Sequence, residues 1–143
     1  MITLIFFLFP TVVLAQTDTL TIEYHYHSGQ LSLQSRGPED RMLHIVFDIY
    51  GREVARQEDH RSSFSIHTSF TFHANGGVRQ MKTHNNPGAS RYWYDHIRTF
   101  SEMGLLLQEE SQRNGLTTSR IIYHYDEHGK RTSETQECWP IGL

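Results

Sequence analysis

Five glycines recur along this chain at nearly regular intervals, and each ends a similar five-residue window. They are Gly29, Gly51, Gly76, Gly104 and Gly129, which lie 22, 25, 28 and 25 residues apart. The windows read HYHSG, FDIYG, FHANG, FSEMG and YDEHG, and four of the five begin with Phe or Tyr. Self-similarity at such a period is typical of chains built from repeated units. The pattern predicts about five degenerate repeats of 22–28 residues. The alternative is five ordinary turns among the 10 glycines of an all-β protein.

The segments that precede the windows alternate between apolar and polar residues. Period-two alternation rich in aromatic and β-branched residues is the signal of half-buried strands. It is clearest at Leu20–Tyr26, Leu43–Ile49, Phe64–Phe72 and Ile121–Tyr125.

Two segments are less regular. Residues 90–100 are aromatic but alternate less cleanly, and residues 101–112 leave a short helix open as an alternative to a strand. Gly104 would lie in the first turn of that helix and disfavours it.

Each window also contains the residues of a tight turn. An aromatic residue closes the first strand, and a short polar residue such as Asp48, Ser101 or Asp126 can then bond the backbone ahead of it in a type I turn. The glycine three residues later adopts the left-handed conformation that forms a G1 bulge. The sequence therefore predicts an all-β fold, a meander of antiparallel β-hairpins.

Several of these units resemble a known repeat family. YHYHSGQLSLQ (Tyr24 to Gln34) and FHANGGVRQM (Phe72 to Met81) resemble bacterial MORN-variant repeats of the YwqK type, whose units read aromatic-aromatic-x-[Asn/Ser]-Gly-[Lys/Gln]-[Leu/Val]. The last unit, YHYDEHGKRTSE, is similar to the Tyr-Asp repeats of Rhs-type surface proteins. The resemblance covers most of residues 20–135. It implies repeated β-hairpins and no conserved catalytic site. The family's typical second turns, rich in Lys-Asn-Gly-Lys, are missing from this chain.

The first 15 residues read MITLIFFLFPTVVLA and differ from the rest. An uncharged apolar run that ends in Val-Leu-Ala is the pattern of a secretory signal peptide, with cleavage before Gln16. The alternative is an uncleaved membrane anchor, although the run is shorter than the roughly 18–20 residues of a spanning helix. We therefore expect a signal peptide at residues 1–15, one domain at residues 16–143 and an exported protein, periplasmic or extracellular. After cleavage we expect no stable membrane span.

The net charge argues against nucleic acid as a partner of this chain. A formal net charge of −3 does not suit nucleic-acid binding, which requires a basic surface. The single cysteine, Cys138, cannot form an internal disulfide. It is therefore buried, free or available to a second chain. An open strand at the end of the sheet could pair with another copy of the chain.

The sequence holds no recognisable catalytic motif, and we predict no cofactor, no metal site and no enzymatic activity. The 10 histidines leave metal binding as an alternative. His25 and His27 would share one face of a strand, and His124 and His128 flank the last turn.

Three adjacent aromatic residues, Tyr92, Trp93 and Tyr94, are the candidate surface for binding. Exposed Tyr and Trp are favoured in binding surfaces, and they could also stack on sugars. Alternatively, the outer rings pack under the loop HNNPGAS (His84 to Ser90). The predicted function is a non-enzymatic repeat protein that presents a β-sheet surface to a protein or a cell-envelope component. The rival is a metal- or carbohydrate-binding envelope module.

Overall fold

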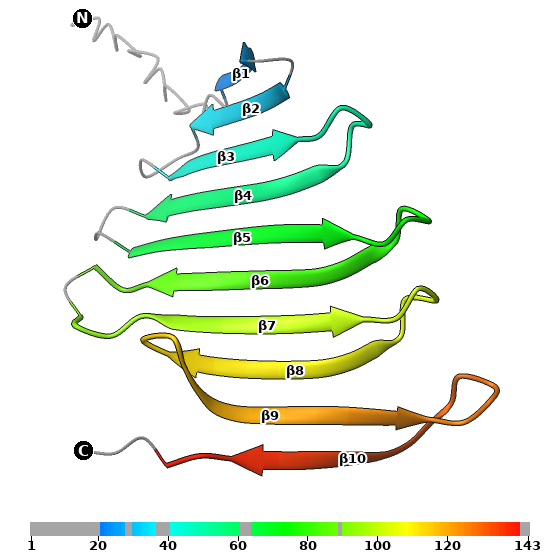
Figure 1. Ribbon diagram of the computed structural model, residues 1–143. Coiled ribbons are helices and arrows are strands. Elements are labelled where there is room, and N and C mark those ends of the chain that lie inside the picture. The colour runs from blue at the N-terminus through cyan, green and yellow to red at the C-terminus, as the bar shows by residue number, and fades with distance from the viewer. Residues whose placement is uncertain (1–20, 28–29, 37–40, 61–63, 89, 141–143) are drawn as a thin grey trace, which may run out of the picture.

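The computed structural model folds into one sheet of ten strands, whose order across the sheet is their order along the chain (Figure 1). It describes the backbone of residues 21–27 and 30–36, and both backbone and side chains of residues 41–60, 64–88 and 90–140. Each strand runs antiparallel to the one before it. The predicted all-β meander of antiparallel strands is confirmed.

The strands have similar lengths, and no helix occurs in the described ranges. Their bounds are β1 Thr21–His27, β2 Gln30–Arg36, β3 Met42–Phe47, β4 Glu53–His60, β5 Phe64–Phe72, β6 Val78–Asn86, β7 Tyr94–Phe100, β8 Leu106–Arg113, β9 Leu116–Tyr125 and β10 Arg131–Cys138.

The sheet is a single layer (Figure 1). Among the side chains that the structure describes, no apolar one is buried, and the only buried residues are Asp95 and Glu110. Most strand residues are half-buried by their neighbours on the same face. Stability therefore rests on the strand ladder and on cross-strand side-chain pairs, since no second layer of described residues covers either face.

The turns that join β3–β4, β5–β6, β7–β8 and β9–β10 lie at one end of the strands (Figure 1). In each, the glycine N–H donates to the carbonyl three residues earlier, at 3.0 Å. The four glycines have φ between 76° and 88°. The turn assignment is thus confirmed at Gly51, Gly76, Gly104 and Gly129, whereas Gly29 lies outside the described residues.

A second irregularity follows each of these turns at the same offset. The residue three positions after the glycine has no partner in the register, while the residues on both sides of it are paired. These unpaired residues are Val54, Arg79, Leu107 and Thr132. The turn and the bulge therefore recur together in four hairpins. The backbone geometry of these hairpins is more similar than their sequences are.

The connections at the other end of the strands differ from one another. Between β8 and β9 the loop is only Asn114–Gly115, with φ of 51° and 78°. Two left-handed residues make a type I′ turn, for which Asn-Gly is a preferred pair. Asn114–Gly115 therefore closes a two-residue hairpin between β8 and β9.

Two expectations need correction. The helix left open at residues 101–112 does not form, because Gly104 closes a turn and Leu106 opens β8. The strand expected to reach Ile49 ends at Phe47. Ile49 instead lies in the turn, where the Asp48 carboxylate accepts the N–H groups of Tyr50 and Arg52.

Candidate functional site

The two faces of the sheet carry different side chains. Because directly opposed residues share a face, the register assigns each described residue to one side. The aromatic face carries Phe47, Phe72, Phe100 and Tyr125, the residues that precede the four turns. The histidine face carries His44, His67, His84 and His124.

Neighbouring turns are tied to each other at the turn end of the sheet. His73 Nε2 lies 2.9 Å from the carbonyl oxygen of Phe100, and Asn75 Nδ2 donates to the carbonyl oxygen of Glu102 at 2.9 Å. One hairpin further along, the Tyr125 hydroxyl donates to the Leu106 carbonyl at 2.6 Å. These bonds join elements far apart in sequence and hold the turns in a stack.

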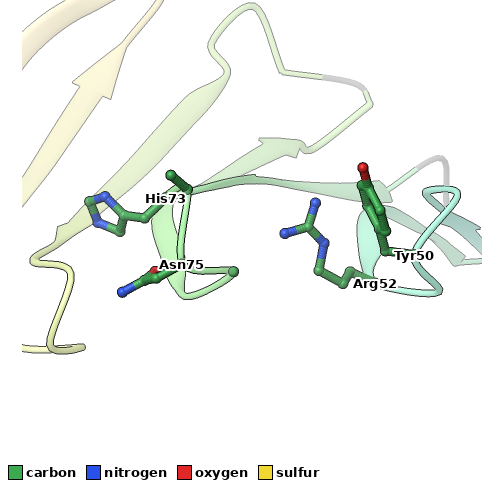
Figure 2. Close-up of a pocket in the computed structure, with 6 residues that line it drawn as sticks. Tyr50, Arg52, His73 and Asn75 are labelled. Atoms are coloured by element: carbon green, nitrogen blue, oxygen red, sulfur yellow. The ribbon is translucent and has the colours of Figure 1, made fainter.

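A shallow hollow lies between the turn at Asp48–Gly51 and the turn at His73–Gly76. Tyr50 and Arg52 border it on one side, and His73 and Asn75 on the other (Figure 2). The Arg52 guanidinium lies 4.2 Å from the centre of the Phe72 ring and pairs with Asp48 at 2.7 Å.

Of the polar side chains around the hollow, Arg52, His73 and Asn75 each have a partner within the protein. The turn tips expose both kinds of side chain: Ile49, Tyr50 and Met103 are 77%, 76% and 81% exposed, and the β9–β10 turn exposes His128 and Glu127.

The predicted aromatic residues lie at the opposite end of the strands. Tyr94 begins β7, whereas Tyr92 and Trp93 precede it in the loop. Trp93 is held by two bonds to the β8–β9 turn: its N–H donates to Asn114 Oδ1 at 3.1 Å, and its carbonyl accepts the Asn114 N–H at 3.0 Å. The three side chains are 42–46% exposed. The Tyr92 ring lies 3.7 Å from the Arg113 guanidinium.

These observations favour aromatic rings that are exposed for binding over rings that pack under the loop at residues 84–90. The loop expected at residues 84–90 is also shorter, because β6 extends to Asn86.

The structure adds two residues to this surface that sequence reasoning missed. Leu116, directly after the Asn114–Gly115 turn, is 65% exposed, and Trp139, directly after β10, is 41% exposed. The Trp139 N–H donates to the Thr118 carbonyl at 2.9 Å, which ties Trp139 to the same end of the sheet. We call Tyr92, Trp93, Tyr94, Leu116 and Trp139 the aromatic edge. Trp139 had no neighbouring aromatic in the sequence to signal it.

Two carboxylates on the histidine face are buried. Asp95 is 6% exposed and accepts from Lys82 Nζ at 2.9 Å and from His84 Nδ1 at 2.5 Å. Burial alone would raise the pKa of Asp95, but the bonds and charges of Lys82 and His84 outweigh it and hold the pKa below its ordinary value.

Glu110 behaves in the same way on β8. Burial works against its charged form, but bonds from Gln112, Thr117 and Arg120 outweigh burial and lower its pKa.

Other candidate ligands of the sequence analysis are dispersed. His124 Nε2 lies 3.1 Å from the Thr135 hydroxyl, and His128 points to Glu127. Cys138 is exposed at the end of β10. The side chains of His25 and His27 lie outside the described residues. Within the described part of the chain, no three His, Cys, Asp or Glu residues gather as a metal site.

A scan of family models found none that matches this chain, and a search of curated proteins found no significant relative. The resemblance to MORN-variant repeats therefore stands on the quoted residues alone. No helix in the described ranges has the length and apolarity needed to cross a membrane.

Proposed function

We propose that this chain is an exported, non-enzymatic repeat protein that presents its sheet to a partner protein or a cell-envelope component. The observation that carries the proposal is the aromatic edge, where five large apolar or aromatic side chains are 41–65% exposed at one end of the strands. Exposed Tyr and Trp side chains are favoured in interaction surfaces. Tyr and Trp also lose little conformational entropy on binding, which favours them in contact surfaces.

The rigidity of the edge adds support. Backbone hydrogen bonds hold Trp93 to Asn114 and Trp139 to Thr118, so both rings start from ordered backbone. A surface that is already ordered pays less entropy on association than a mobile loop does.

Photo-crosslinking in the native cells tests the proposal. A photoreactive phenylalanine analogue at Leu116 should give one discrete adduct, because this position lies within the aromatic edge. The same analogue at Thr135, an exposed polar position on β10, is the matched control and should give none. The absence of an adduct at Leu116, or equal adducts at both positions, would contradict the proposal.

Export is tested separately by amino-terminal sequencing of the protein recovered from the periplasm or medium. We expect the mature chain to begin at Gln16. Recovery of the intact first 15 residues in the membrane fraction would support the anchor instead.

The aromatic edge also favours carbohydrate as a second candidate ligand, because exposed aromatic rings can stack on sugars. Trp93 and Trp139 are the 2 tryptophans of the chain, so tryptophan fluorescence reports directly on this edge. Saturable quenching or a spectral shift with envelope glycans, lost in Trp93→Ala, would identify a sugar ligand. An unchanged spectrum would leave the protein partner.

A further inference from the structure

His67 on β5 and His84 on β6 lie directly opposite each other on the histidine face. Directly opposed residues of an antiparallel pair have Cβ atoms about 4.5–5.5 Å apart. Imidazole nitrogens bind divalent metals at about 2.0–2.1 Å. Two opposed histidines can therefore reach one ion by side-chain rotation, with no movement of the backbone.

One of the two imidazoles is already oriented. His84 uses Nδ1 for its 2.5 Å contact with the buried Asp95, which leaves Nε2 for a ligand. Lys82 Nζ holds the other oxygen of the same carboxylate at 2.9 Å. A carboxylate behind a histidine sets the ring's tautomer and orientation in many metal sites, and here Asp95 also offsets the charge of Lys82.

The other imidazole is available. His67 is exposed, and no hydrogen bond or ion pair joins it to another residue of the described ranges. The side chain of His84 is 37% exposed, so an ion from solvent can reach both rings.

We propose that His67 and His84 form a two-histidine site for a divalent transition metal ion, with Asp95 as a positioning residue behind His84. Water would complete the coordination. A pair of imidazoles without thiolate suits Cu²⁺, Ni²⁺ or Zn²⁺ rather than Mg²⁺ or Ca²⁺. The site lies beyond the proposed interaction function and does not depend on it.

Equilibrium dialysis of the purified protein against micromolar Cu²⁺ and Zn²⁺ tests the site. We expect His67→Ala and His84→Ala each to remove one bound equivalent or to weaken its binding at least tenfold. His44→Ala is the matched control, because His44 lies on the same face opposite Gln57 and should leave uptake unchanged. Far-UV circular dichroism checks that each variant is folded. If His84→Ala does not fold, the exposed His67→Ala decides the test.

Electron paramagnetic resonance of the Cu²⁺ form gives an independent readout. We expect nitrogen couplings from two imidazoles, reduced to one in His67→Ala. Asp95→Asn should weaken binding about 10–100-fold while both nitrogens remain in the spectrum. No uptake by the parent protein at micromolar metal, or equal uptake by parent and His67→Ala, overturns the proposal. Loss of the equivalent only in His25→Ala/His27→Ala also overturns it.

Discussion

At the residue scale, different side chains close turns of the same backbone shape. Asp126 Oδ1 accepts the N–H groups of His128 and Lys130, as Asp48 Oδ1 does in its own turn. In the HANG turn the first position is His73, and Asn75 Oδ1 instead accepts the Gly77 N–H at 3.0 Å. The side chain that accepts the backbone N–H groups can therefore stand at different positions of the window, whereas the left-handed glycine is present in every described copy.

We expect Gly51→Val and Gly129→Val each to lower the free energy of unfolding by about 1–2 kcal/mol, since a branched side chain is strained at positive φ. A Cβ at Gly51 would meet no atom within 4 Å, so the cost there comes from the backbone alone. At Gly129 a Cβ would also lie 3.7 Å from Leu105 Cδ1. Urea unfolding measures both.

Gly51→Asn is the matched control, because Asn tolerates the left-handed region, and it should cost clearly less than Gly51→Val. Equal stabilities for the parent and both valine variants would show that these turns do not depend on glycine.

The two buried carboxylates make the free energy of unfolding depend on pH. Because Asp95 and Glu110 have lowered pKa values when folded, the unfolded chain takes up protons first as pH falls. Their contribution is complete above the unfolded pKa values of about 3.9 for Asp and 4.3 for Glu, and it is lost as pH falls through the folded values. We expect urea midpoints to fall between pH 5 and pH 3.

The double variant Asp95→Asn/Glu110→Gln should show a smaller fall over the same pH interval. A fall as large as that of the parent would mean that other carboxylates dominate the acid sensitivity.

At the element scale, side chains at the turn end link each hairpin to the next. Arg52 covers Phe72, His73 and Asn75 contact the following turn, and the Tyr125 hydroxyl donates to the preceding hairpin. Such contacts give neighbouring hairpins a shared interface, which a lone hairpin lacks.

Tyr125→Phe removes only the hydroxyl bond to the Leu106 carbonyl and should cost about 0.5–1.5 kcal/mol in urea unfolding. Tyr123→Phe is the matched control on the same strand. The Tyr123 ring lies 4.2 Å from the Arg131 guanidinium, but its hydroxyl has no partner among the described residues. If both variants lost the same stability, the cross-hairpin bond would not be the cause.

At the scale of the whole molecule, the sheet has two open faces and each strand is paired only with its neighbours in the chain. Unfolding of a typical folded protein raises the heat capacity by about 12–15 cal/mol/K per residue, mostly because apolar surface becomes exposed. Since no described apolar side chain is buried, we expect calorimetry to give a value below that range. A value within it would mean that one face is covered in solution.

Sequence reasoning recovered the local structure well. The alternation predicted the strands, and the glycine windows predicted the four described turns, because both depend on residues only a few positions apart. The Asn114–Gly115 turn was not predicted although its Asn-Gly pair is a hairpin signal, because it does not end an aromatic window.

The sequence by itself determined that the chain is a series of antiparallel hairpins with left-handed glycines at their turns. Only the tertiary structure decided that these hairpins join in one uncovered layer. It also decided that Tyr92–Tyr94, Leu116 and Trp139 lie at the same end of the strands and that His67 faces His84. The reason is physical: such neighbours depend on strand register. The register depends on the length of every loop and on every bulge between the paired residues. A shift of one residue would send each side chain to the other face.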